Sequence, residues 1–209
     1  MKKSLMKKPA HWPAMMLAAA SVLLCCSAWA AAQQPAQAQQ SRQQAAQKYF
    51  TDVVLVNQDG ERMRLYTDLL KDKVVVINFF FATCQGSCLP MNRNMQKVQD
   101  VFGDRLGKDA YLISISVDPA TDTPARLKEY AAKVGARPGW YFITGDKENV
   151  ALALKKLGQY VENREDHTNI VLIGNERTGL WKKAFGLAKS EEFNKVVESV
   201  LNDQPPSGQ

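Results

Sequence analysis

The stretch Val74–Cys88, which reads VVVINFFFATCQGSC, decides the fold. Its first part, Val74–Phe81, is β-branched or aromatic except for one asparagine. A continuous run of this kind predicts a strand buried on both faces, as in the interior of a parallel sheet. Cys84 and Cys88 come directly after it, and Pro90 favours the first turn of a helix. The stretch therefore predicts a buried strand, a loop with two cysteines and a helix.

Strand and helix patterns alternate on either side of this stretch. Upstream, two short strand-like runs flank Asp59-Gly60, a hairpin signal, and downstream the patterns alternate before ending in two strands and a helix. The expected strands are Val53–Asn57, Arg62–Thr67, Val74–Phe81, Tyr111–Val117, Trp140–Thr144, Asn169–Gly174 and Leu180–Phe185. Four helices are expected, beginning near Pro90, at Pro124, at Lys147 and at Ser190. Thr123 is expected to be the N-cap of the second helix, and Ser190 the N-cap of the last.

This order of elements predicts an α/β fold: an N-terminal hairpin, then βαβαβα, then a terminal ββα. Strands that alternate with helices form a parallel sheet covered on both faces, and the last two strands add an antiparallel edge. The layout is that of a thioredoxin-like domain. A doubly wound nucleotide-binding fold competes with it, but that fold needs a glycine-rich loop after its first buried strand. Thr83-Cys84-Gln85-Gly86 does not supply one.

Beyond residue 30 the chain has two cysteines, Cys84 and Cys88, and one histidine, His167. Both thiols follow the carboxyl end of a strand and lie near a helix N-terminus, which favours the thiolate. In a thioredoxin-like topology the loop with His167 lies beside the cysteine loop. Two thiolates and an imidazole suit Cu(I), Cu(II) or zinc rather than magnesium or calcium. Three protein ligands also leave a coordination position open, as a protein that passes its metal on requires.

Plainer interpretations exist for each of these residues. Two cysteines in an exported protein commonly form a structural disulfide, but a bridge that closes so short a loop stabilises little, which favours a redox or metal role. His167 can be a surface histidine. Met91 and Met95 share a helical stripe with core residues and are expected to pack in the core. Asp118, at a strand end, is read as a turn residue rather than a reactive acid.

The N-terminus has the pattern of a targeting segment. Met1–His11 is basic, residues 12–32 are uncharged and apolar, and Ala28-Trp29-Ala30 fits a cleavage site. Residues 1–30 are therefore expected to be a signal peptide, or an uncleaved membrane anchor spanning residues 12–32. Either alternative exports the chain to a bacterial periplasm. Cys25 and Cys26 are read as apolar residues of this leader.

A glutamine-rich segment separates the leader from the folded part. It contains eight glutamines between Gln33 and Gln47, so residues 31–47 are expected to form a linker, either a tether or a disordered lead-in. Residues 48–203 are expected to form one domain, and residues 204–209 a disordered polar tail.

The composition excludes several classes of protein. Hydrophobic residues make up 45% and charged residues 23%, which is typical of a globular chain rather than a disordered or multi-pass membrane protein. The net charge is +6, but Lys2, Lys3, Lys7 and Lys8 belong to a leader without acidic residues. The folded part therefore lacks the basic excess that a nucleic-acid partner requires.

The residues resemble the Sco (SenC) family over about Val53–Leu201. VVVINFFFATCQGSC, SVDPATDTP, YFITGDKENV and DHTNIVLIG occur in the order seen in that family. The resemblance implies a thioredoxin-like copper protein that takes part in cytochrome c oxidase assembly. It also implies that Cys84, Cys88 and His167 are the three copper ligands. Gln85 and Leu89 depart from the family's prolines, so the cysteine loop is expected to be looser.

Two functions follow from this sequence. The first is a copper metallochaperone without catalytic turnover, which serves the copper-site subunit of a cytochrome c oxidase or its assembly factors. The alternative is a thiol–disulfide oxidoreductase that uses the Cys84/Cys88 dithiol on other thiol proteins. A peroxidase is a third and weaker reading, because the usual Pro-x-x-x-Thr-x-x-Cys spacing is absent. Only the copper function requires His167.

Overall fold

The computed structural model describes residues 37, 39–84, 86 and 88–204. By their contacts the residues fall into two units, Met1–Ser41 and Arg42–Gln209, and the fold described below belongs to the second. The expected leader at residues 1–30 and the tail beyond Gln204 lie outside the described residues. Within the described part, no helix is long and apolar enough to cross a membrane.

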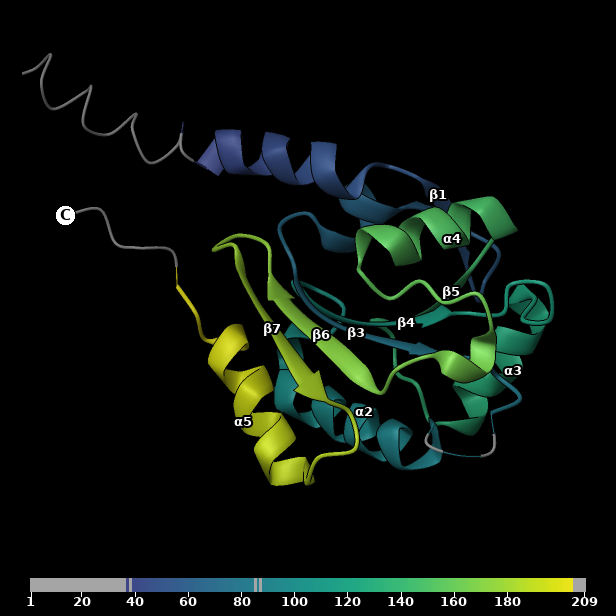
Figure 1. The fold of residues 1–209 in the computed structure, drawn as a ribbon. Helices are drawn as coiled ribbons and strands as arrows, with labels where there is room; N and C mark the ends of the chain where they lie inside the picture. The colour runs from purple at the N-terminus through teal and green to yellow at the C-terminus, as the bar shows by residue number, and fades with distance from the viewer. Residues whose placement is uncertain (1–36, 38, 85, 87, 205–209) are drawn as a thin grey trace, which may run out of the picture. The chain divides into compact units, whose positions relative to one another are not determined.

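Seven strands form one mixed sheet at the centre of the fold. They are β1 (Val54–Asn57), β2 (Arg62–Arg64), β3 (Val74–Phe80), β4 (Ala110–Ser116), β5 (Trp140–Thr144), β6 (Ile170–Asn175) and β7 (Leu180–Phe185). Their order is β2-β1-β5-β4-β3-β6-β7 (Figure 1). β3, β4 and β5 are parallel, whereas the other pairings are antiparallel. The expected α/β class, with a parallel centre and an antiparallel edge, is confirmed.

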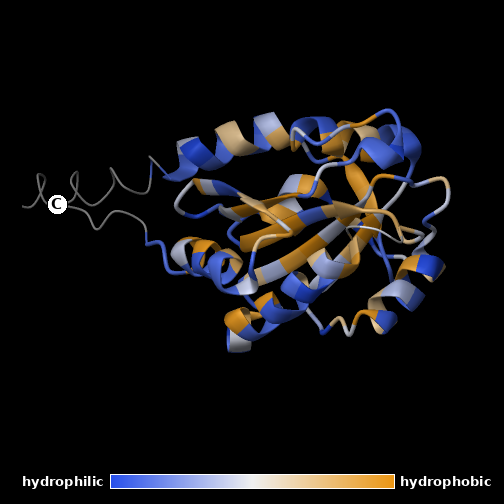
Figure 2. Ribbon diagram, turned by 60° about the horizontal axis from the view of Figure 1, so that its bottom comes forward, coloured by the Kyte–Doolittle hydropathy of each residue, from blue (hydrophilic) through white to orange (hydrophobic). Residues whose placement is uncertain are grey.

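Helices cover both faces of the sheet. They are α2 (Cys88–Phe102), α3 (Pro124–Lys133), α4 (Lys147–Lys156) and α5 (Ser190–Leu201), with short turns η1 (Leu65–Leu70), η2 (Gly103–Arg105) and η3 (Arg164–Asp166). Core residues of α2, α3 and α5 gather on one face, and those of η1 and α4 on the other. Apolar residues accordingly concentrate between the layers, with polar residues outside (Figure 2).

Strand β3 shows why the sheet needs two covering layers. All seven of its residues are buried. Because successive side chains of a strand point to opposite faces, Val76 and Phe80 join the core under α2, whereas Ile77 and Phe79 join the core under α4. A strand that is apolar on both faces can only lie at the centre of a sandwich, which places its carboxyl end, and the cysteines after it, at the edge of the sheet.

Two local predictions from the sequence are wrong. The second hairpin strand ends at Arg64 rather than continuing to Thr67, because η1 begins at Leu65 and its Asp68 carboxylate accepts the backbone N–H of Arg64. Ser190 does not cap α5; Lys189 is the N-cap residue, and the Ser190 hydroxyl donates to Asn94 of α2 at 2.6 Å. The Thr123 cap of α3 is confirmed, since its side chain accepts the N–H of Arg126.

The end of the glutamine-rich segment is helical. Residues 39–50 form a helix, which differs from a disordered lead-in, because glutamine and alanine are good helix formers. Within the second unit, Ala46 and Phe50 pack on the core under α4, and Gln43 donates to Asp72 at 2.7 Å. The structured part of the second unit thus begins before residue 48.

Candidate metal centre

The structure brings Cys84, Cys88 and His167 together. Cys84 lies in the loop after β3, Cys88 is the first residue of α2, and His167 follows η3 just before β6. The two sulfurs and a ring nitrogen all lie within 4.8 Å of one another, and Cys88 Sγ is 3.8 Å from His167 Nε2. The thiols are not bridged. Three donors from sites up to 83 positions apart in the chain therefore converge at the carboxyl end of β3.

The two cysteines differ in their surroundings. Cys88 is fully buried, whereas Cys84 is partly exposed. Burial, followed by the neighbouring Cys84, raises the pKa of the Cys88 thiol well above its ordinary value. Desolvation acts on the Cys88 thiol in the opposite direction to the expected effect of the helix N-terminus, because burial disfavours the charged form. A metal must displace the proton of Cys88 when it binds.

His167 presents one particular nitrogen to the thiols. Its Nδ1 lies 2.7 Å from the carbonyl oxygen of Arg164. A carbonyl only accepts hydrogen bonds, so Nδ1 carries the hydrogen, and in the neutral ring Nε2 keeps its lone pair. The Phe81 ring meets the imidazole edge-on, with centroids 5.3 Å apart. The nitrogen that faces Cys88 is thus the one able to bind a metal.

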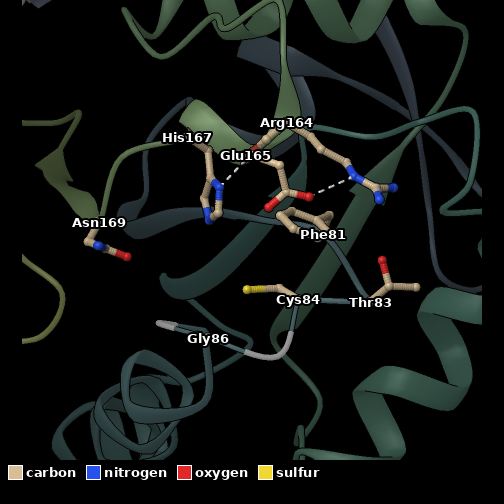
Figure 3. Close-up of a pocket in the computed structure, with 8 residues that line it drawn as sticks. All are labelled: Phe81, Thr83, Cys84, Gly86, Arg164, Glu165, His167 and Asn169. Carbon is tan, nitrogen blue, oxygen red and sulfur yellow. Dashed lines mark hydrogen bonds and ion pairs between the residues drawn. The ribbon is translucent and has the colours of Figure 1, made fainter.

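An open cleft of about 360 Å³ gives access to these groups (Figure 3). In Figure 3 the Cys84 sulfur and the His167 ring lie on opposite sides of the cleft and face one another. The residues that line it are Phe81, Thr83, Cys84, Gly86, Arg164, Glu165, His167 and Asn169. A small partner group can therefore reach Cys84 and His167 from solvent, while Cys88 lies beneath them.

Asp118 lies beside this centre but is not among the three converging donors. Its carboxylate pairs with Arg164, whose side chain also stacks on Phe81 with 4.9 Å between the guanidinium carbon and the ring centroid. Burial raises the pKa of Asp118, but hydrogen bonds from Thr121 and Arg164 outweigh it and hold this pKa below its usual range. An ionised, paired carboxylate favours the turn interpretation over a reactive acid.

Two supporting residues were not predicted from the sequence. Asp122 is fully buried and accepts hydrogen bonds from the Ser116 hydroxyl at 2.6 Å and the Ala82 backbone N–H at 3.1 Å, which ties the cysteine loop to β4. Arg164 contacts Asp118 and Phe81, which lie far away in sequence. Asp122 belongs to the SVDPATDTP motif, but the motif does not show that its carboxylate accepts the distant Ala82 N–H. No local pattern marks Arg164, because only the fold brings Asp118 and Phe81 close to it.

Met91 and Met95 are fully buried in the core under α2, so the expectation that they pack in the core is confirmed. The donors at hand are therefore two thiols and one imidazole. A sheet with a parallel centre, a dithiol after its central strand and an imidazole at the start of the adjacent antiparallel strand define a thioredoxin-like thiol protein.

Comparison with known proteins identifies the family within this class. A family model described as SCO1/SenC matches residues 38–202, and the chain belongs to that family. A SCO1 protein homolog of Bacillus subtilis (strain 168) is 33% identical over 153 residues, which cover 69% of this chain and 77% of the relative. The Sco resemblance of the sequence is thereby confirmed.

Solved structures share the fold. A SCO1/SenC family lipoprotein from Bacillus anthracis str. Ames is 28% identical, with a TM-score of 0.60 over 71% of this chain and 92% of that one. BsSco is described as having a disulfide switch and as a member of the Sco family of cytochrome c oxidase assembly proteins. It is 27% identical, with a TM-score of 0.59 over 72% of this chain and 92% of BsSco. Yeast Sco1, solved with copper bound, is 23% identical, with a TM-score of 0.60 over 75% of this chain and 95% of the yeast chain.

Proposed function

We propose that this chain is a copper metallochaperone whose ligands are Cys84, Cys88 and His167. The observation that carries the proposal is the convergence of two sulfurs and one imidazole nitrogen within 4.8 Å at an open cleft. Thiolates are soft ligands that hold Cu(I), and imidazole is the borderline ligand that supports Cu(II). Membership of the SCO1/SenC family agrees with this donor set.

The geometry suits a protein that passes its cargo on. Cys88 is fully buried, whereas Cys84 and His167 line a cleft open to solvent. An acceptor's ligands can approach from that cleft and replace the exposed donors first. We propose that the acceptor is the copper-site subunit of a cytochrome c oxidase, or an assembly factor that acts on it. We expect transfer without catalytic turnover.

Copper binding by the full chain tests this proposal. Cys25 and Cys26 are also thiols, so the measurements use a Cys25→Ser, Cys26→Ser background. The reduced protein is expected to bind about one Cu(I), and Cys84→Ser or Cys88→Ser to abolish tight binding because the thiolates supply most of the affinity. His167→Ala is expected to weaken Cu(II) more than Cu(I). Equal copper affinity in the parent and in all three variants would refute the proposal.

A thiol–disulfide oxidoreductase is the second candidate. Two unbridged thiols lie side by side, one of them exposed enough to attack a partner disulfide. His167→Ala separates the two functions, since thiol exchange needs only the cysteines. If that variant binds both copper states like the parent and supports oxidase assembly, the oxidoreductase takes first place.

We propose that the protein acts in a bacterial periplasm, exported by its N-terminal segment. Residues 1–30 are then either a cleaved signal peptide or an anchor that tethers the domain through residues 12–32. The relative from Bacillus anthracis is a lipoprotein, which agrees with attachment to a membrane. The N-terminal sequence of the protein purified from its host distinguishes cleavage from anchoring.

A further inference from the structure

The segment that carries His167 has little packing to hold it in place. None of the side chains from residue 161 to residue 169 is buried. The Thr168 hydroxyl donates to Gln159, and the Asn169 carbonyl accepts the N–H of Gly186, but both contacts lie on the β6 side of His167. An apolar contact comes from the Phe81 ring, which meets the imidazole edge-on, so the rest of the loop must be held over the thiols by polar groups.

Arg164 makes contacts in three directions. Its guanidinium pairs with Asp118, in the connection after β4, and its side chain is 40% exposed against 14% for Asp118. The same guanidinium stacks on Phe81, in the segment that leads from β3 to Cys84. Its carbonyl accepts from both His167 Nδ1 and the His167 backbone N–H. Figure 3 shows the guanidinium beyond Phe81 and the imidazole turned toward the Arg164 backbone.

We infer that Arg164 is a positioning residue that fixes His167 over the dithiol. The inference rests on the proposed copper function and deepens it. The side chain of Arg164 attaches the loop to the ends of two neighbouring strands, and its carbonyl selects the tautomer in which Nε2 faces Cys88. Without the side chain, the carbonyl remains but the loop loses both anchors, so the imidazole no longer keeps one position relative to the sulfurs.

This role of Arg164 affects which oxidation state of copper the site binds more tightly. Cu(I) can be held by the two thiolates, whereas Cu(II) depends more on the imidazole. Loss of an ion pair and a cation–π contact near the surface is expected to weaken Cu(II) binding about tenfold. Cu(I) binding is expected to change little. Arg164 thus sets the preference of the site between the two states without touching the metal.

The test uses the full chain in the Cys25→Ser, Cys26→Ser background. Arg164→Ala removes the contacts of the side chain with Asp118 and Phe81, and also its pairing with the adjacent Glu165 in the same loop. Arg164→Lys keeps the charge without the planar stacking, and Asp118→Asn breaks the ion pair from the other side. Arg137→Ala is the matched control, since Arg137 is also a partly exposed arginine paired with an aspartate, Asp100. Competition with chelators measures both copper affinities, and absorption and electron paramagnetic resonance spectra report the Cu(II) ligands.

We expect Arg164→Ala to shift the Cu(II) spectrum toward that of His167→Ala. The spectrum of Arg164→Lys should lie between those of Arg164→Ala and the parent. Asp118→Asn should shift the spectrum in the same direction as Arg164→Ala. The control is expected to match the parent. In a His167→Ala background, Arg164→Ala should change nothing further. The inference is overturned if Arg164→Ala keeps the parental Cu(II) affinity and spectrum. It is also overturned if the loss is the same without His167, because Arg164 would then act through its charge.

A copper-free measurement keeps the inference separate from the proposed function. Nitrogen-15 NMR of the reduced apoprotein, with the His167 signals assigned from the His167→Ala spectrum, reports the tautomer of this imidazole. The parent and Arg137→Ala are expected to show Nδ1 protonated and Nε2 free, and Arg164→Ala a mixture of both forms. If the parent binds no copper, the proposed function fails, and this spectrum alone decides the role of Arg164. Identical tautomers in parent and Arg164→Ala would overturn it.

Discussion

Replacement of Asp122 should destabilise the protein and loosen its cysteine loop. Asp122→Ala removes the acceptor of the buried Ser116 hydroxyl and of the Ala82 N–H. A buried donor left without a partner costs roughly 1–3 kcal/mol, and the Ala82 N–H is only partly buried, so we expect a loss of about 3 kcal/mol in the free energy of unfolding. For a domain of this size that corresponds to a fall in Tm of roughly 6–12 °C. Asp122→Asn keeps an acceptor and should cost about 1 kcal/mol.

The pH dependence of this effect has a defined sign. Burial raises the pKa of Asp122, while hydrogen bonds from Ser116 and Ala82 partly oppose the rise. The folded state therefore holds the Asp122 proton to a higher pH than the unfolded state does. The stabilisation from that proton is complete below the ordinary aspartate pKa and is lost as pH rises through the raised value. Asp122→Asn should remove this part of the pH dependence.

Urea unfolding followed by tryptophan fluorescence, at several pH values, measures both effects. The matched control is Asp100→Ala, because Asp100 is 77% exposed and pairs only across the surface with Arg137. This control should change the free energy of unfolding by less than about 0.5 kcal/mol. Should Asp122→Ala prove as stable as Asp100→Ala, the reasoning that this carboxylate ties the loop to β4 is refuted.

Three further outcomes are expected. Iodoacetamide should alkylate Cys84 well before Cys88, because Cys88 is fully buried and its thiol has a raised pKa; peptide mass spectrometry of the reduced protein checks the order, and equal rates would contradict it. Gly174→Ala should lower the Tm by several degrees in thermal unfolding, since a Cβ there would lie 2.5 Å from the Trp181 ring and displace it; an unchanged Tm would contradict this. Ser190→Ala should cost about 1 kcal/mol in urea unfolding through lost contacts with α2, and an unchanged midpoint would contradict this.

The central strand shows how much of the fold could be predicted from local sequence. Val74–Phe80 is apolar at six of its seven positions, so burial on both faces followed from the sequence alone. The hairpin was predicted but the end of its second strand was not, because the end of β2 depends on the Asp68 side chain rather than on a hydrophobic pattern. The prediction of Ser190 as an N-cap was wrong because its hydroxyl contacts Asn94 on α2, and no local sequence pattern indicates such a contact.

The sequence by itself determined the alternation of strands and helices, the two-layered core and the three donor residues, because each depends on residue type and short-range spacing. Only the tertiary structure decided that Cys88 is buried, which raises the pKa of its thiol, that His167 presents Nε2, and that Arg164 joins His167 to Phe81 and Asp118. The physical reason is that the His167 tautomer depends on the loop conformation that brings the Arg164 carbonyl to Nδ1, while burial and ion pairing depend on groups that lie 40 or more positions apart in the chain. These groups meet only where the ends of β3, β4 and β6 come together in the sheet.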